Sequence, residues 1–170
     1  MLAKEHGLEG IHYIQTLNGF RPVAKMDLFD SFVEFEPHYT LAQEDGISYW
    51  KWMESKDEEG KYVLDYDQVW SKIINRSADR QNIIPGAFVD WDNTARRGKE
   101  GTVYHGASPD KFEQYLTKQI RRAKQEFQSE YLFINAWNEW AEGAYLEPDK
   151  RFEDRYLRAV NTARKNAEIE

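Results

Sequence analysis

The sequence contains no cysteine, which excludes disulfide bonds, a thiol nucleophile and cysteine metal ligands. This absence fits a reducing compartment, so we expect a cytoplasmic location. The chain also lacks an excess of positive charge, since its net charge is −7 at pH 7 and its isoelectric point is about 5.2. Nucleic acids and anionic membranes bind basic surfaces. We therefore expect neither as a partner.

Long apolar runs are missing as well. No uninterrupted run approaches the roughly 18 residues of a membrane span. The first 15 residues, MLAKEHGLEGIHYIQ, have no apolar core of the length found in signal peptides. We expect no membrane span in the chain. If Met1 is not the natural start, a targeting segment can still lie upstream of it.

Aromatic residues, in contrast, are abundant. They make up 15% of the chain and include six Trp and ten Tyr. Exposed aromatic rings suit flat, partly apolar ligands, and sugars fit that description. The length of 170 residues, with 41% hydrophobic and 31% charged residues, is typical of one folded unit. We predict a single domain over residues 1–170.

Four short runs of strand-forming residues alternate with helical patterns. The runs are Gly10 to Thr16, Ser31 to Glu36, Ile83 to Asp90 and Glu130 to Ala136. Asp65 predicts the start of one helix and Ser108, followed by a proline, the start of another. A last helix is expected to carry Phe152, Tyr156, Leu157, Val160 and Ala163. The alternation predicts an α/β chain with parallel strands.

Polar and aromatic clusters follow each predicted strand. Functional groups of parallel β/α proteins gather at the carboxyl ends of the strands, and the catalytic face of a (β/α)₈ barrel has this pattern. A complete barrel takes about 250 residues and eight strands, however. This chain offers four strands.

The richest cluster is FINAWNEWAEGAYLEPD at residues 133–149. Continued strand alternation would place Asn135, Trp137 and Glu139 on one side, and Glu142 can reach the same space if the chain turns. Two carboxylates among Trp rings are what cleavage of a glycosidic bond requires, one as an acid and one as a base or nucleophile. The spacing alone is weak evidence, because chance also produces it. A non-catalytic ligand site and a purely structural role stay open.

The second cluster contains Glu34, Glu36 and His38 on one strand parity, so all three can face a cleft and contact substrate. The alternative is structural, with Glu34 paired to an arginine and His38 as an ordinary hydrogen-bonded histidine. No ligand spacing of a metal site is recognisable among them.

The third cluster is DWDNTARRG, beginning at Asp90. We predict that Asp90 or Asp92 accepts hydrogen bonds from sugar hydroxyls or from Arg96, with Trp91 as a wall. The D-x-D form also occurs in sugar-nucleotide transferases, where it holds a divalent cation on a diphosphate. It arises by chance too, so we expect no metal unless the protein is such a transferase.

Four ordered segments resemble one known family. NAWNEWAEGAYLEPD closely resembles the C-terminal signature of WbsX-type glycosyltransferases, which are related to glycoside hydrolase family 99 and share its (β/α)₈ barrel. FVEFEPH, PGAFVDWDNTARRG and YHGASPDKFEQYL are similar to further segments of that family, in the same order. The resemblance covers essentially the whole chain and, because family members are about twice as long, implies the last four β/α units.

The resemblance also implies roles. In the related hydrolases the matching N-E-W-x-E stretch supplies both catalytic carboxylates, which fall here on Glu139 and Glu142. Glu142 would be the general acid and base at the glycosidic oxygen. Glu139 would take a proton from the 2-hydroxyl of the sugar, which then attacks the anomeric carbon. Trp137, Asn138 and Trp140 would contact the substrate.

The resemblance implies bacterial lipopolysaccharide or O-antigen metabolism, with an oligosaccharide or polysaccharide as substrate, and leaves open whether the bond is hydrolysed or transferred. An isolated half-barrel would expose two strand edges. We therefore expect either a missing N-terminal half-barrel or a homo-oligomer partner. The alternative function is a non-catalytic carbohydrate-binding half-barrel or an inactive fragment.

Overall fold

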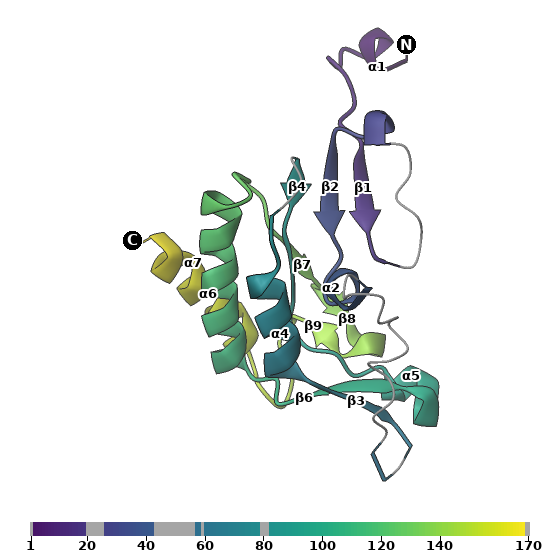
Figure 1. Cartoon of the computed structure of the whole chain (residues 1–170), viewed down its shortest axis with the longest axis vertical. Helices are drawn as coiled ribbons and strands as arrows, with labels where there is room; N and C mark the ends of the chain where they lie inside the picture. The colour runs from purple at the N-terminus through teal and green to yellow at the C-terminus, as the bar shows by residue number, and fades with distance from the viewer. Residues whose placement is uncertain (1, 20–25, 43–56, 59, 79–81, 169–170) are drawn as a thin grey trace.

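The computed structural model describes residues 2–19, 26–42, 57–58, 60–78 and 82–168 (Figure 1). Within them the chain is a mixed α/β structure. Its strands are β1 (Ile14–Leu17), β2 (Ser31–Glu34), β3 (Tyr62–Asp65), β4 (Ile83–Ile84), β5 (Gly86–Phe88), β6 (Thr102–His105), β7 (Phe133–Asn135), β8 (Asn138–Glu139) and β9 (Ala144–Tyr145). The α-helices are α1 (Leu2–Glu5), α2 (His38–Ala42), α4 (Tyr66–Asn75), α5 (Thr94–Arg97), α6 (Pro109–Gln125) and α7 (Arg155–Glu168), and the 3₁₀ turns are η1 (Met26–Leu28), η2 (Gly98–Glu100) and η3 (Trp140–Glu142).

The predicted strands form two small parallel sheets that follow one another along the chain. The first has the order β1-β2-β4 and the second pairs β5 with β7. Only Pro85, which has no N–H for a ladder, separates β4 from β5. Strands therefore lie beside their sequence neighbours and run the same way, which is compatible with part of a β/α barrel.

The strands are shorter than the sequence predicted. The first begins at Ile14 rather than Gly10, the second ends at Glu34 rather than Glu36, and the fourth covers only Phe133–Asn135. The third is broken at Pro85, because proline interrupts the ladder. Strand-forming composition identified the right segments but extended them into the loops on either side.

The predicted helix starts are confirmed. The carboxylate of Asp65 accepts a hydrogen bond of 2.8 Å from the backbone N of Gln68 and caps α4. Ser108 caps α6, and Pro109 occupies its first turn, where no N–H is needed. The last helix begins at Arg155, so Phe152 precedes it, contrary to the prediction.

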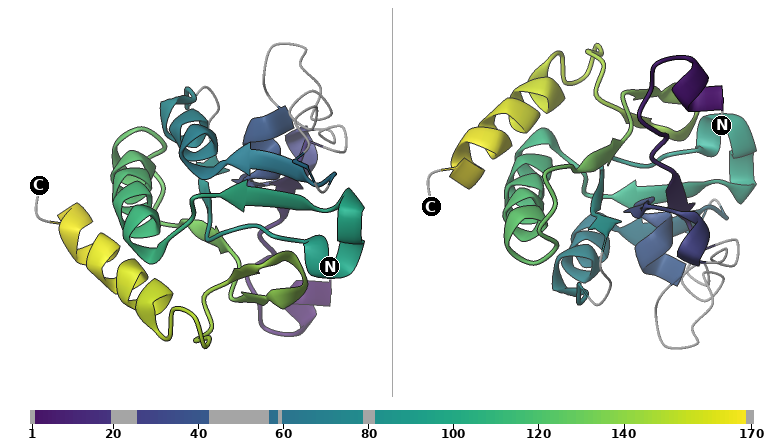
Figure 2. Two further views of the ribbon diagram at one scale, coloured as in Figure 1. Left: turned by 90° about the horizontal axis from the view of Figure 1, so that it is seen from below. Right: turned by 90° about the horizontal axis from the view of Figure 1, so that it is seen from above.

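An aromatic core joins the helices to the sheet. Helices α4, α6 and α7 lie together beside β5 (Figure 2), and Trp70 of α4 stacks on Phe88 of β5 with ring centroids 5.3 Å apart. Trp70 also stacks on Tyr115 of α6, with ring centroids 5.4 Å apart. Such rings bury 150–250 Å² each, so this stack is the main apolar support of the strand that leads to Asp90.

A parallel ribbon of β3 and β6 was not predicted. Its register pairs Tyr62 with Thr102 and Asp65 with His105. Tyr104, which precedes the end of β6, is buried in the core beside Phe88. None of the described helices is both long and apolar enough to cross a membrane.

Candidate active site after strand β7

The segment after β7 folds into a short antiparallel hairpin. Strand β7 ends at Asn135, and β8 pairs with β9 so that Glu139 lies opposite Ala144. The turn η3 lies between them and ends at Gly143, whose φ of 65° is left-handed. Continued strand alternation through residue 139 is therefore wrong. The turn nevertheless places Glu139 and Glu142 on one small hairpin beyond a parallel strand.

The two acids have different surroundings. Arg96 of α5 forms an ion pair with the carboxylate of Glu142, and the backbone O of Glu142 accepts a hydrogen bond of 2.8 Å from the backbone N of Asp92. Glu139 is exposed, and within the described residues its carboxylate has no hydrogen bond or ion pair. The hairpin is thus fixed to the loop after β5 through Glu142, while Glu139 faces solvent.

Two Trp side chains of the same segment are partly exposed. Trp137 is 54% exposed and Trp140 is 48% exposed. Trp140 stacks on Tyr145 of β9 with ring centroids 3.8 Å apart, and its indole N–H donates a 2.6 Å hydrogen bond to Glu147. Sequence reasoning missed the role of Tyr145 and Glu147, which lay within the cluster at residues 133–149. Together they fix Trp140 with an open face, while Asn138 is exposed on β8.

Asp90 and Asp92 lie on the loop after β5, which contacts Glu142 through the backbone N of Asp92. The carboxylate of Asp90 accepts a 2.7 Å hydrogen bond from the backbone N of Trp91. Burial raises the pKa of Asp90 to about 6, a shift that the neighbouring charge of Asp92 assists and that the hydrogen bond and Arg151 oppose. Asp92 accepts hydrogen bonds from the backbone and hydroxyl of Thr94.

Arg96 therefore pairs with Glu142 rather than with either aspartate. Among the described residues no group of three or more Asp, Glu or His side chains could hold a metal ion. Cation binding at Asp90 and Asp92 stays a prediction, and it applies only if the protein is a sugar-nucleotide transferase.

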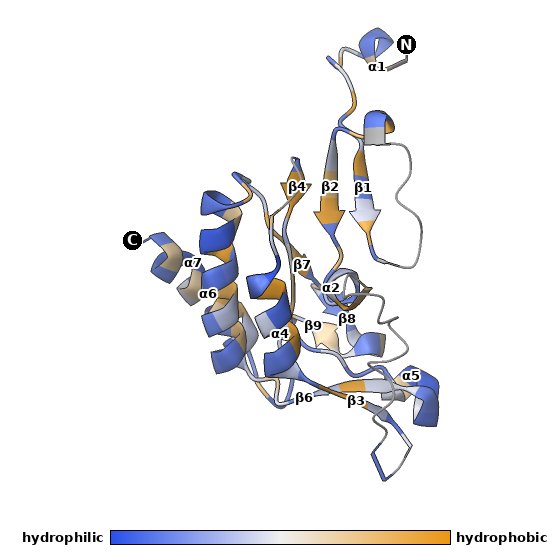
Figure 3. Cartoon of the chain, in the orientation of Figure 1, coloured by the Kyte–Doolittle hydropathy of each residue, from blue (hydrophilic) through white to orange (hydrophobic). Residues whose placement is uncertain are grey.

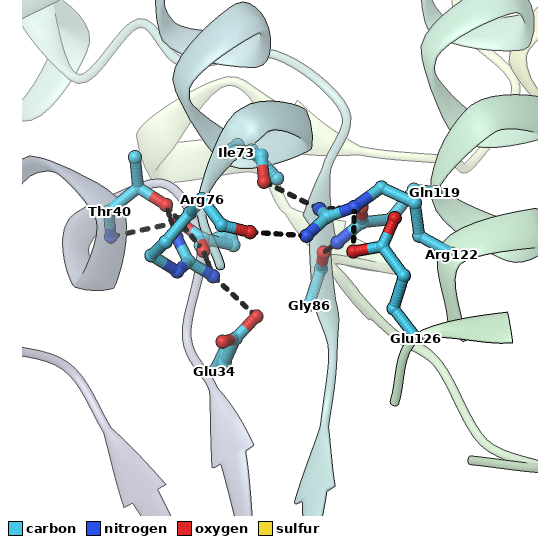
Figure 4. A network of polar contacts seen from close by, with 9 residues as sticks. Glu34, Thr40, Ile73, Arg76, Gly86, Gln119, Arg122 and Glu126 are labelled. Carbon is cyan, nitrogen blue, oxygen red and sulfur yellow. Dashed lines mark hydrogen bonds and ion pairs between the residues drawn. The ribbon is translucent and has the colours of Figure 1, made fainter. Parts of the chain in front are cut away.

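Glu34 and Glu36 are turned toward one arginine. Figure 4 shows Arg76, which follows α4, between Glu34 and Thr40. Its Nη2 lies 2.6 Å from Glu34 Oε2 and 3.1 Å from Glu36 Oε1. Thr40 donates to both carboxylate oxygens of Glu36, at 3.1 Å from its N and 2.7 Å from its Oγ1. The contacts match the structural alternative for Glu34, and substrate contact by either acid stays a prediction.

The charges in this group do not balance. Burial raises the pKa of Glu34, the charge of Glu36 acts in the same direction, and Arg76 opposes both. Burial alone would lower the pKa of Arg76, but Glu36 and Glu34 outweigh it and raise that pKa. Two carboxylates share one guanidinium, so the arginine is held charged while one acid is pushed toward its neutral form.

A second arginine, also missed from the sequence, completes the network. Arg122 of α6 donates to the backbone O of Ile73 at 2.6 Å and of Arg76 at 2.5 Å, which satisfies carbonyls at the end of α4 (Figure 4). Gln119, one turn earlier, donates to the backbone O of Gly86 at 2.8 Å. Helix α6 is thereby bonded both to α4 and to β5.

His38 is buried rather than open to a cleft. Its ring meets Trp91 edge-on at 4.6 Å and stacks on Phe35 at 5.8 Å. Burial lowers the pKa of His38 to about 4, so the ring is neutral at pH 7. Trp91 is buried too and offers no open face as a wall, so substrate contact by either residue stays a prediction.

Comparison with known proteins decides the family. The family model described as "Glycosyltransferase WbsX" matches residues 1–160. The chain belongs to the WbsX glycosyltransferase family. Two relatives, both named "Uncharacterized protein WxcX" and from two strains of Xanthomonas campestris pv. campestris, are 33% identical to this chain over 162 residues. The match covers 94% of this chain but 23% of each relative, so the chain spans about a quarter of their length. No solved structure matches the chain significantly.

Proposed function

We propose that this chain acts on glycosidic bonds of an oligosaccharide or polysaccharide, with Glu139 and Glu142 as its working carboxylates. Membership of the WbsX family supports a carbohydrate-active role. The observation that carries the proposal is the hairpin β8–β9, which carries both acids on the same short segment as the exposed Trp137 and Trp140. Carboxylates supply the acid and base of glycosidic cleavage, and indole faces bind the apolar faces of sugar rings.

In the proposed reaction Glu142 protonates the leaving glycosidic oxygen. Its ion pair with Arg96 gives way when the substrate binds, because a paired carboxylate cannot donate a proton. Glu139, exposed and without a partner in the described residues, accepts the proton of the sugar 2-hydroxyl as that oxygen attacks the anomeric carbon. Water or an acceptor hydroxyl then opens the anhydro sugar, with Glu142 as the base for the attacking hydroxyl while Glu139 returns its proton to the 2-oxygen.

If water opens the anhydro sugar, the protein is a hydrolase. If an acceptor hydroxyl opens it, the protein is a transferase. We further propose that the described strands are the last four units of a (β/α)₈ barrel that acts in the bacterial cytoplasm on surface polysaccharide such as O-antigen. The sequential parallel order β1-β2-β4 and β5-β7 supports the barrel. A transferase that holds a sugar nucleotide through Asp90 and Asp92 would lose activity in chelator.

The test combines turnover and binding on the same variants. Purified chain is assayed with aryl glycosides and with sugar nucleotides, with and without EDTA, and sugar binding is measured by calorimetry. We expect Glu142→Gln and Glu139→Gln to lower turnover by at least 10²-fold, the range of a lost acid or base, while Glu58→Gln at an exposed site changes nothing.

Two outcomes would argue against this function. If the Glu142→Gln chain still binds sugar, and neither it nor the unmodified chain shows turnover, the protein is a non-catalytic sugar-binding module. The pairing of Glu142 with Arg96 in the present structure favours that second candidate. If the chain neither binds nor turns over a sugar, both readings fail.

A further inference from the structure

An arginine is paired with one of the two proposed catalytic acids. The side chain of Arg96 contacts Glu142 through Nη2 and is 52% exposed, whereas the side chain of Glu142 is 16% exposed. A guanidinium has five N–H donors, and within the part of the chain that the structure describes most of those of Arg96 are not used. The acid is mostly covered and about half of the arginine is open. The arginine is therefore the part of this ion pair that a ligand reaches first.

The backbone that carries Arg96 is held firmly. Asn93, which precedes α5, is buried, and its side-chain oxygen accepts a 2.8 Å hydrogen bond from the backbone N of Thr102 on β6. The backbone N atoms of Arg96 and Arg97 both donate to the backbone O of Asn93, at 3.1 and 2.9 Å. These bonds fasten α5 to β6. The guanidinium of Arg96 therefore stays beside the hairpin when its bond to Glu142 opens.

The segment around Arg96 is positive in a chain that is acidic overall. Residues 94–100, which form α5 and η2, include the cations Arg96, Arg97 and Lys99 and one glutamate, whereas the net charge of the whole chain is −7. Arg97 and Lys99 are exposed, and Figure 3 shows mostly hydrophilic colouring on α5. Exposed cations attract anions over roughly 8 Å at physiological salt. This positive segment contacts η3 of the hairpin, so it lies next to the candidate site.

The proposed reaction deprives this arginine of its partner. Glu142 can protonate the leaving oxygen only after its ion pair with Arg96 has opened. A neutral sugar would leave water and hydroxyl groups as the only new partners of the guanidinium. A carboxylate on the sugar would replace Glu142 more fully, because a guanidinium binds a carboxylate through two parallel N–H···O bonds. An acidic substrate would thus release Glu142 and bind Arg96 in the same event.

We propose that the substrate is an acidic oligosaccharide, and that a carboxylate of one of its uronic acid units binds Arg96 in place of Glu142. Opening of the ion pair rests on the proposed function, whereas binding of the carboxylate can be measured without turnover. Trp140, exposed on the same turn as Glu142, supplies an indole for the ring of the sugar. Arg96 is therefore a residue that determines specificity, because it distinguishes an acidic sugar from a neutral sugar of similar shape.

The test compares sugars that differ only in their carboxylates. Calorimetry measures binding of the chain to trimers of mannuronate, galacturonate and glucuronate and to the matched trimers of mannose, galactose and glucose. We expect at least one acidic trimer to bind roughly tenfold more tightly than its neutral counterpart, the effect of a hydrogen bond between charged groups. Raising the salt concentration to about 1 M should remove most of this preference, because the screening length falls to about 3 Å.

Variants test whether Arg96 causes the preference. Arg96→Gln should reduce the preference for the acidic trimer to about twofold or less, and Arg96→Lys should retain part of it, because lysine keeps the charge without the planar fork. The matched control is Arg155→Gln, which removes another half-exposed arginine, paired with Asp110 of α6, and should leave the preference unchanged. Where turnover is measurable, Arg96→Gln should raise KM for the acidic sugar roughly tenfold and should not raise KM for the neutral sugar.

The outcomes distinguish this specificity from the proposed reaction, and circular dichroism verifies the fold of each variant. If no acidic trimer binds more tightly than its neutral counterpart, or if Arg96→Gln keeps the preference, the assignment of Arg96 is wrong even where neutral sugars are turned over. If acidic trimers bind through Arg96 but no sugar is turned over, the carboxylate site is confirmed and the proposed reaction is wrong. If Arg96 governs binding of UDP-glucose but not of any acidic trimer, it binds the diphosphate of a donor, and the uronic acid assignment is overturned.

Discussion

Replacement of Arg76 by methionine probes the buried charge group that supports the loop after β2. The substitution keeps an unbranched apolar side chain but removes the guanidinium that lies 2.6 Å from Glu34 and 3.1 Å from Glu36. Removing one partner of a buried ion pair typically costs 3–5 kcal/mol, because a buried charge is left without compensation. We expect a loss of about 4 kcal/mol in the free energy of unfolding at pH 8.

The loss should shrink as the pH falls. Burial already raises the pKa of Glu34 in the folded protein, and without Arg76 the folded state binds a proton more readily still. A group whose folded pKa is raised makes the folded state more stable as the pH falls through that pKa. At pH 5 we expect the difference between variant and unmodified chain to be roughly half of its value at pH 8.

The assay is urea unfolding followed by Trp fluorescence at both pH values, and each variant is compared with the unmodified chain at the same pH. Arg158→Met is the matched control, since Arg158 pairs with Asp154 on the surface and should show no resolvable change. Should Arg76→Met fail to fold, Glu34→Gln provides a second test. This variant leaves one carboxylate for one guanidinium. Its loss in the free energy of unfolding should therefore be less than about half of the loss in Arg76→Met. Equal losses for Arg76→Met at pH 8 and pH 5 would refute the charge argument.

Three further results are expected. Gly143→Ala should cost about 1–3 kcal/mol of unfolding free energy and lower turnover, because φ is 65° and a Cβ would lie 2.8 Å from the backbone N of Asp92. The control is Gly7→Ala, which also has a positive φ, 75°, but has open space around it and should leave turnover unchanged. The unmodified chain should lose roughly 3 kcal/mol of unfolding free energy through His38 as the pH falls from 6.5 to 4. Burial lowers the pKa of His38 to about 4 in the folded protein, so the unfolded state binds the extra proton first. Denaturant titrations of His38→Gln should lack this pH-dependent loss. Trp140→Ala should weaken oligosaccharide binding by calorimetry at least tenfold, roughly the effect of one stacked aromatic ring, and Glu147→Gln should weaken it less, because Tyr145 still orients the indole.

Local signals predicted the helices and the position of the acid cluster. Asp65 and Ser108 act through bonds to residues three positions away, so their capping role can be predicted from the sequence. Glu139 and Glu142 were predicted to lie beyond the last strand of the run, and they do. The predicted geometry was wrong in detail, since alternation does not continue past Asn135.

The partners in contacts between distant residues could not be identified from the sequence, although pairing of Glu34 with some arginine was one of the alternatives. Arg76 pairs with Glu34 across 42 positions, the difference between 76 and 34, and Arg96 meets Glu142 across 46. Helix propensity and strand alternation carry no information about such pairs. The ribbon of β3 and β6 escaped notice for the same reason, because its four-residue strands pair across a gap of about 40 residues and each is too short to give a period.

The buried group around Arg76 gives Glu34 and Glu36 a function that does not require contact with a sugar. The side-chain amide of Asn135, the last residue of β7, donates a 3.0 Å hydrogen bond to the backbone O of Glu36. The carboxylate of Glu36 is held by Arg76 and Thr40, so the end of β7 is fixed to a loop that is itself fixed to α4. The hairpin with the proposed catalytic acids starts at Asn138, three residues after Asn135. Because positioning of reacting groups within a fraction of an ångström dominates catalytic efficiency, the network behind the strands determines where Glu139 and Glu142 lie.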